Sequence, residues 1–334
     1  MDTPAYVRYR ILIDLEGAAP DSPAARAALA ETLADPRVAL LLEDVSRWPG
    51  TVLNSHKSAS QTFHTLEFLS ELGLPGDHPS VATAVDRILE SAGPDGVPRL
   101  PMTYPKQFGG PGVEMSSWAL CDAPTLLTAA VRFGRSGDAR VRRGIATLTA
   151  LARENGWPCA VSPELKFRGP GRKEDPCPYA TLVMLRLLAA YAEALAGASA
   201  HAAASSEEAD AILSSDAARA GVGALLACWE RSRDWHPYIF YAGDDFRKLK
   251  APFLWYDVLH VAEILSCFPF ARGDPRLAAM LEVIRSKRGA SGGYRPESAY
   301  QPYKAWDFGQ KKEDSPWLAF LIRRLEARFD KRQV

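Results

Sequence analysis

Apolar residues recur at spacings of three and four along most of the chain, and the alternation of valine and isoleucine that marks β-strands is almost absent. Such spacing places the apolar side chains on one face of an amphipathic helix. Alanine, leucine and arginine dominate the segments with this pattern. We therefore predict a nearly all-α protein.

One set of predicted helices begins at an aspartate. An aspartate side chain accepts hydrogen bonds from the free N–H groups of a first helical turn, and proline suits the first helical position. Turn sequences such as GPDGVP and ENGWP follow these helices. The helices of this set are expected to begin at Asp35, Asp77, Asp138, Asp216 and Asp274.

A second set of helices follows long polar loops, and several of its members share an apolar core such as APTLLTAAVRFG or YATLVMLRLLAAY. The equivalent positions Thr65, Thr125, Thr181, Asp257 and Leu318 stand about 60, 56, 76 and 61 residues apart. The expected ranges of this set are 5–15, 60–73, 118–134, 178–194, 254–268 and 315–329.

The alternation of the two sets predicts how the chain is arranged in space. Alternating helices either stack into an open solenoid or close into a ring, and a count near six with long entering loops favours closure. The longest interval contains HAAASSEEADAILSSD, which we interpret as a surface insertion at about 197–214. We predict an all-α, closed α/α toroid that forms one domain over residues 1–334, with about six inner and five to six outer helices.

Composition and charge narrow the function. The 334 residues contain 40 Lys+Arg and 40 Asp+Glu, so the formal net charge is zero and a nucleic-acid partner is not expected. Charges interrupt the N-terminal apolar run, unlike in a signal peptide, and no membrane span is expected, so we predict a cytoplasmic protein. Five widely spaced cysteines without a CxxC pair predict reduced thiols.

The stretch 166–188 joins a basic loop, rich in glycine and proline, to the start of an apolar helix, with Asp175 and Cys177 at the junction. A helix start favours anions and thiolates, because its N–H groups are unpaired and its dipole end is positive. Asp175 and Cys177 could therefore bind a metal such as zinc, or Cys177 could act as a thiolate nucleophile. The alternative is a helix cap followed by a buried cysteine.

Gly156-Trp157 and Gly293-Tyr294 precede loops, and two helix starts read DPCPYATLVML and CDAPTLLTAA. These features resemble the α/α toroid of the terpenoid cyclases and protein prenyltransferases, and the chain is most similar to the short squalene-cyclase-like proteins of bacteria. The resemblance implies an enzyme, either a cyclase-like lyase or isomerase or a prenyltransferase-like transferase. It also implies an isoprenoid or an isoprenyl diphosphate as the substrate.

The chain departs from both families at their motifs. Class II cyclases carry DxDD just ahead of a threonine in an inner helix, whereas CDAP precedes Thr125 and CPYA precedes Thr181 here. Prenyltransferase β subunits bind zinc through Asp-x-Cys and a histidine one repeat later, and they work with an α subunit. Asp175 and Cys177 match the first part, but the later position falls near Phe253, where no histidine stands.

Three further residues at helix starts are candidates for acid–base chemistry. Asp122 could be a general acid or a helix cap. Asp257 lies in an apolar helix, and His260 is three residues on and on the same face. They could form an oriented acid–base pair or a hydrogen-bonded structural pair.

Basic side chains in the entering loops predict an anion-binding rim around the helix N-termini. Such a rim on a neutral protein would attract an anionic small-molecule ligand such as a phosphate, a diphosphate or a carboxylate. The alternative is that these cations only solvate the loops. The predicted anion-binding residues are Lys166, Arg168, Arg172, Lys173, Arg247, Lys248, Lys250 and Lys311.

Two other function classes stay open. A non-catalytic toroid could hold an anionic ligand or a partner peptide. Other α/α toroids cut glycans with paired acids, so a glycan lyase or hydrolase is a further alternative. The sequence favours no single acidic pair for that reaction.

Overall fold

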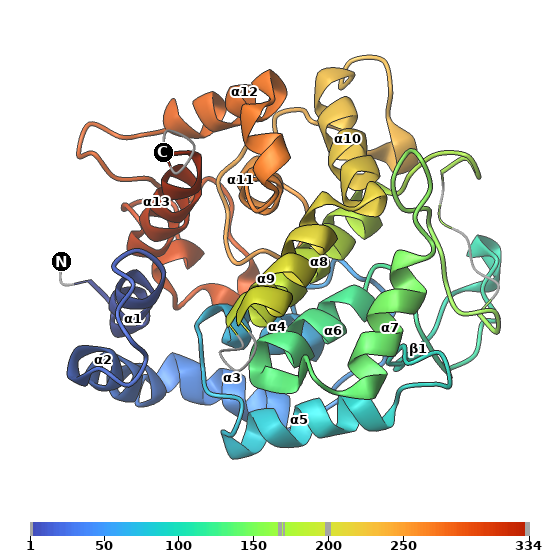
Figure 1. Cartoon of the computed structure of the whole chain (residues 1–334), viewed down its shortest axis with the longest axis horizontal. Coiled ribbons are helices and arrows are strands. Elements are labelled where there is room, and N and C mark those ends of the chain that lie inside the picture. Colours follow the sequence, from blue (N-terminus) through green and yellow to red (C-terminus); the bar gives the residue numbers. More distant parts are fainter. Residues whose placement is uncertain (1–2, 166–168, 170, 198–201, 331–334) are drawn as a thin grey trace.

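The computed structural model describes residues 3–165, 169, 171–197 and 202–330, and it confirms the all-α prediction. Two layers of helices form a closed α/α toroid (Figure 1). The inner helices of the described chain are α1 (Ala5–Asp14), α4 (Thr62–Glu71), α6 (Ala123–Ala130), α8 (Pro178–Gly197), α11 (Val258–Leu265) and α13 (Pro316–Asp330). The outer helices are α2 (Pro23–Leu33), α3 (Pro36–Ser46), α5 (Pro79–Glu90), α7 (Ala139–Thr149), α10 (Asp216–Glu230) and α12 (Pro275–Arg285).

The inner helices α4, α6 and α11 are buried on every side, whereas α1 and α13 are only partly buried. Every residue of α4, α6 and α11 is buried. The outer helices instead bury one face, as α5 does through Val81, Ala84, Val85, Ile88 and Leu89. Complete burial therefore distinguishes these three inner helices from the outer layer.

The first and last inner helices close the ring. α1 packs against α13. The chain just after α4 also lies close to α1, as shown at Gly73, where an added Cβ would lie 2.5 Å from the Arg10 guanidinium. Tyr6 of α1 donates a hydrogen bond to Asp307, which also accepts one from the Trp317 backbone N–H at 2.9 Å. The ends of the chain thus share one buried cluster.

The aspartate caps are confirmed at Asp35, Asp138 and Asp274, whose side chains accept backbone N–H groups of α3, α7 and α12. The other two are wrong by one residue. α5 is preceded by His78, which makes no side-chain cap, and α10 is capped by Ser215.

Some elements were not predicted. α2 follows a Ser22 cap, and its alanine-rich sequence PAARAALAETL carries only a weak apolar stripe. Two short strands, β1 (Leu100–Met102) and β2 (Met115–Ser117), pair antiparallel with Leu100 opposite Ser117. The loops also contain short 3-10 or π turns, η1 (Lys106–Phe108), η2 (Val131–Arg135), η4 (Pro237–Ile239), η5 (Pro269–Gly273), η6 (Gln301–Tyr303) and η7 (Asp307–Gly309).

α8 is the longest of the inner helices in the described part of the chain, and it is strongly apolar. An 18-residue window within it has a mean hydropathy of 1.4, so its length and composition would allow it to cross a membrane. The bent pair Ser205–Ser214 and Asp216–Glu230 passes the same test when taken together. However, 67% of the α8 window is buried inside the protein, as expected for an inner helix of the toroid.

The segment interpreted as a surface insertion contains one more helix, α9 (Ala202–Ser214). α9 lies along α8 and stands outside the alternation of inner and outer helices (Figure 1). α9 extends to the C-terminal ends of the inner helices.

Candidate functional site

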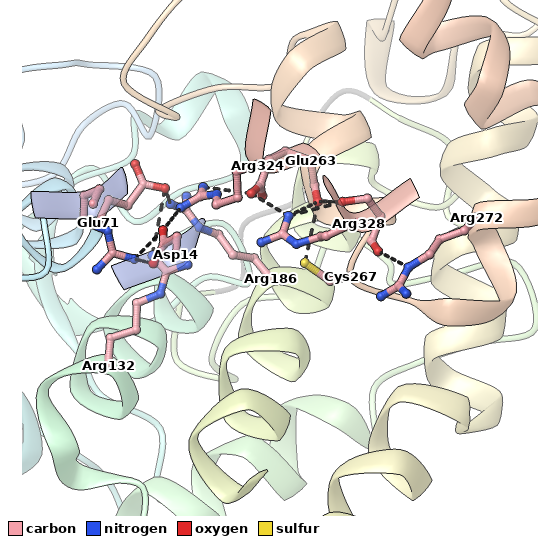
Figure 2. Close-up of polar contacts among 11 residues, drawn as sticks. Asp14, Glu71, Arg132, Arg186, Glu263, Cys267, Arg272, Arg324 and Arg328 are labelled. Atoms are coloured by element: carbon pink, nitrogen blue, oxygen red, sulfur yellow. Dashed lines mark hydrogen bonds and ion pairs between the residues drawn. The ribbon is translucent and has the colours of Figure 1, made fainter. Parts of the chain in front are cut away.

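A cavity of about 770 Å³ lies at the C-terminal ends of the inner helices. We call it the arginine cavity, because guanidinium groups from several elements line it (Figure 2). Cations are favoured at helix C-termini, where unpaired carbonyl groups carry partial negative charge. The lining arginines are Arg10, Arg132, Arg186, Arg272, Arg324 and Arg328.

Arg186 forms the floor of the cavity, close to the axis of the toroid. Its side chain is 1% exposed, and its Nη1 lies 2.7 Å from Glu67 Oε1, while Nη2 donates to Glu71. Burial raises the pKa of Glu67 to about 7, with Arg186 opposing the shift and Glu71 adding to it. Arg132 stands on the other side of Glu71, at 3.9 Å from its Oε1. Two carboxyl groups one helical turn apart therefore share the same buried guanidinium.

A second group of ion pairs forms the adjoining wall. Glu263 of α11 accepts from Arg324 at 2.8 Å and from Arg328 at 2.6 Å. Asp14 of α1 pairs with Arg10 at 2.6 Å and with Arg324 at 3.2 Å. Burial acts to raise the pKa of Glu263, but the two guanidinium groups outweigh it and hold that pKa well below its usual range.

Cations outnumber carboxyl groups in this buried network. Arg10, Arg132, Arg186, Arg324 and Arg328 face Asp14, Glu67, Glu71 and Glu263, which is five guanidinium groups against four carboxyl groups. Four guanidinium nitrogens are buried and find no hydrogen-bond acceptor in the described part of the chain, although an unpaired buried donor is costly. They are Arg10 Nε, Arg132 Nη1, Arg186 Nε and Arg324 Nε.

The remaining wall of the cavity combines apolar side chains with the polar Glu193, Ser206 and Asp210. It comes from the second half of α8 and from α9, together with Ile264 of α11 and Val131 of η2. Ala209 of α9 is buried on this side, whereas Glu207 and Glu208 of the same helix point to solvent. The cavity is therefore a charged floor with a partly apolar wall beside it, a combination typical of sites that bind small molecules.

A separate buried cluster lies at the opposite end, where α6 begins. We call Asp122, His56 and Tyr104 the histidine–aspartate cluster. Asp122 Oδ1 accepts from the Ala119 N–H at 3.2 Å, and Oδ2 lies 3.4 Å from His56 Nδ1. The other ring nitrogen of His56 contacts the Tyr104 hydroxyl. Burial raises the pKa of Asp122 to about 8 and lowers the pKa of His56 to about 3.

Sequence reasoning proposed Asp122 and missed His56. Asp122 stands out because it marks the start of an inner helix. His56 lies in the irregular loop before α4, where no periodicity or capping pattern marks it. In the structure, His64 Nε2 donates to the His56 carbonyl at 2.8 Å, a contact that the sequence does not reveal.

Cys177 is buried at the start of α8, with the Cys121 thiol beside it. A hydrogen bond with the Cys121 thiol lowers the pKa of Cys177, and burial opposes this shift. Asp175 lies two residues earlier and is partly exposed. Among the described residues no group of three or more His, Cys, Asp or Glu side chains is arranged to hold a metal ion. A zinc site at Asp175 and Cys177 stays a prediction without a third ligand.

Asp257 and His260 meet as a helix cap. Asp257 Oδ1 accepts from the His260 backbone N–H at 2.9 Å, so the carboxyl contacts the backbone of His260. The His260 ring lies 2.9 Å from the Trp255 carbonyl through Nδ1 and stacks on Phe253 at 4.6 Å. Burial raises the pKa of Asp257 to about 7, with Lys250 opposing the shift. These contacts match the structural alternative.

The predicted anion-binding residues occupy varied positions. Lys166 and Arg168 lie outside the described residues, and Arg172, Lys173 and Lys311 are exposed in loops. Lys248 and Lys250 both pair with Asp245, at 3.2 and 3.3 Å. Arg247 stacks over the Trp229 ring at 5.0 Å. The anion-binding rim at this end stays a prediction, and the buried arginines gather at the other end.

Comparison with known proteins gives no match by sequence: no protein-family model and no curated protein matches the chain. Among solved structures, the unsaturated glucuronyl hydrolase from Bacillus sp. GL1 is 13% identical with a TM-score of 0.46, over 98% of this chain and 85% of that one. A protein from Actinoplanes is 16% identical with a TM-score of 0.39, over 97% and 87%.

The type II terpene cyclase MstE from Scytonema, in its apo form, is 13% identical with a TM-score of 0.38, over 98% of this chain and 87% of that one. A glycan-degrading hydrolase and a terpene cyclase are thus both among the similar chains. Likenesses of this extent assign no activity to this protein.

Proposed function

We propose that the protein binds an anionic, partly apolar small molecule in the arginine cavity. The carrying observation is the set of guanidinium groups that line one cavity beside alanine and leucine side chains. Arginine binds carboxylates and phosphates through paired N–H groups, and such bonds are strong when water is excluded. The volume of about 770 Å³ falls within the range of small-molecule sites.

Three ligand classes follow from this chemistry. An isoprenoid or isoprenyl diphosphate is supported by the resemblance to the cyclases and prenyltransferases. Within the glycan alternative, an acidic sugar such as a uronate is the ligand that would bring an anionic group to the arginines. An alkyl phosphate carries a negative charge and an apolar chain but has neither an isoprenoid nor a sugar framework. It therefore tests whether charge and apolar surface alone are enough for binding.

Calorimetric titration tests this proposal. Geranyl diphosphate, octyl phosphate, glucuronate and inorganic phosphate are titrated into wild type and into Arg132→Gln. We expect at least one amphiphilic anion to bind, with roughly 10- to 100-fold weaker binding to the variant, because charge-assisted hydrogen bonds contribute about 1.5–3 kcal/mol. Arg135→Gln is the matched control, since Arg135 is on the same turn but exposed and paired with Asp86 at 2.9 Å. Equal loss in both variants, or no binding of any probe, would overturn the proposal.

A second candidate function is acid–base catalysis at the histidine–aspartate cluster. It is supported by the position of Asp122, a buried carboxyl that holds its proton near neutral pH beside a neutral imidazole. A carboxyl in this state can donate a proton as a general acid. Cys177, close to Cys121 at a neighbouring helix start, is the remaining nucleophile candidate.

The same set of probes also tests catalysis, because a substrate of the histidine–aspartate cluster need not be the ligand of the arginine cavity at the other end. After prolonged incubation, mass spectrometry separates an unchanged ligand from an isomer, a hydrolysed product or a transferred group. Product formed by wild type and by Asp138→Asn but not by Asp122→Asn supports acid–base catalysis. A ligand recovered unchanged supports the non-catalytic alternative.

A further inference from the structure

α9 has no counterpart in the two-layer alternation, yet it closes one side of the arginine cavity. Ser206, Ala209, Asp210 and Leu213 of α9 all line the cavity. These positions are three and four residues apart, so they form one face of the helix. A helix that contributes a full face to a cavity helps to decide the shape of what the cavity accepts.

The polarity of the cavity changes along α8. Arg186 is at the buried inner end, and the alanines that line the cavity follow it toward the C-terminal end of the helix. The exposed carboxyl groups of Glu193 and Asp210 also line the cavity, with Glu193 about two helical turns beyond Arg186 and between the lining residues Ala192 and Ala194. An anionic head group is therefore favoured at the inner end beside the arginines and disfavoured beside these carboxyl groups, where like charge repels it.

The apolar path has a definite length. Alanines line the cavity from Ala189 to Ala196 on α8, which is about 10 Å at a helical rise of 1.5 Å per residue, and Glu193 is the one carboxyl group among them. This is the length of an alkyl chain of roughly eight carbons, since extended C–C bonds of about 1.5 Å each advance by somewhat less than their length. Ala209 and Leu213 face this path from α9.

We propose that Ala209 and Leu213 of α9 determine the chain length of the ligand, whose oxyanion head lies against Arg132, Arg186 and Arg324 and whose apolar chain runs between α8 and α9. This inference rests on the proposed function, because it concerns the same cavity. It adds an orientation, head inward and chain outward, and it assigns the selectivity to a helix outside the toroid layers.

The test is a calorimetric titration of the full chain with soluble alkyl phosphates, from ethyl to dodecyl phosphate, below their micelle-forming concentrations. For wild type we expect the affinity to rise about fourfold for each added methylene up to roughly octyl phosphate and then to level off. Ala209→Phe shortens the apolar path, so its best ligand should be shorter by roughly two or three carbons. Leu213→Ala opens the path, so its plateau should move to longer chains.

Glu207→Phe is the matched control, because it adds the same aromatic ring to the exposed face of α9. It should leave the series unchanged. If alkyl phosphates bind to wild type but Ala209→Phe and Leu213→Ala leave the preferred chain length where it was, the role of α9 is wrong while the cavity remains the site. If no alkyl phosphate binds at all, the proposed function itself fails.

Discussion

Single residues show most clearly how burial changes chemistry in this protein. Asp122 and Asp138 are both aspartates next to the start of a helix, yet their pKa values move in opposite directions. Burial raises the pKa of Asp122 to about 8, whereas the hydrogen bond from the Arg140 guanidinium lowers the pKa of Asp138 to about 2. The sequence shows an aspartate at both places, and only the fold distinguishes them.

Asp122→Asn should stabilise the protein at pH 8. In the folded state Asp122 retains a proton that it releases in the unfolded state above its ordinary pKa of 3.8. The free energy of unfolding of wild type therefore falls as the pH rises from about 4 to 8. The variant has no such loss, and its free energy of unfolding should exceed that of wild type at pH 8 and match it at pH 4. Urea unfolding at both pH values measures this difference.

Asp138→Asn should change the free energy of unfolding in the opposite direction. The folded pKa of Asp138 is depressed, so the stability it contributes is present above the unfolded value and is lost as the pH falls toward 2. The variant should be less stable than wild type at pH 7 and similar to it near pH 2. A pH-independent difference for either variant would contradict the assigned pKa shifts.

Arg186 is the residue whose loss should be most damaging. Arg186→Met leaves Glu67 and Glu71 buried without their shared cation, and breaking such a buried pair costs on the order of 3–5 kcal/mol. Adding Glu67→Gln removes one of the two stranded carboxyl groups and should restore part of that stability. Denaturant unfolding of the single and double variants measures both the loss and the partial recovery of stability. A double variant less stable than Arg186→Met would contradict the assigned pairing of Arg186 with Glu67 and Glu71.

At the scale of elements, the apolar periodicity predicted the inner helices and most outer helices. Its failures have physical reasons. α2 is rich in alanine and presents little contrast between its faces, and β1 and β2 are three residues each, too short for an alternating pattern. α9 was expected as an insertion, but nothing in its sequence shows that one face covers a cavity.

Helix capping gives a prediction at this scale. Asp274 accepts the Arg276 N–H at 2.8 Å as the cap of α12, whereas Asp216 follows the Ser215 cap of α10. Asp274→Ala should therefore lower the free energy of unfolding by about 1 kcal/mol. Asp216→Ala should change it by only about 0.3 kcal/mol, through the helix dipole. Thermal unfolding of both variants decides the matter, and equal losses would show that the assigned cap positions are wrong.

At the scale of the whole molecule, the toroid brings together what the sequence keeps apart. The arginines of the cavity come from α1, η2, α8, η5 and α13, so the cavity joins residues at opposite ends of the chain (Figure 2). An arginine in a helical sequence pattern usually lies on the solvated face of the helix. For this reason the sequence favoured the loop cations as the anion-binding residues. Ring closure decides which arginines become buried.

The location of a bound anion tests this account most directly. A crystal structure of the protein with octyl phosphate would show the phosphate at one end of the toroid or the other. The account predicts that it lies in the arginine cavity, within hydrogen-bond distance of Arg132, Arg186 or Arg324, with its chain between α8 and α9. A phosphate bound instead among the loop cations near Lys248 and Lys250, with the arginine cavity holding only water, would contradict it.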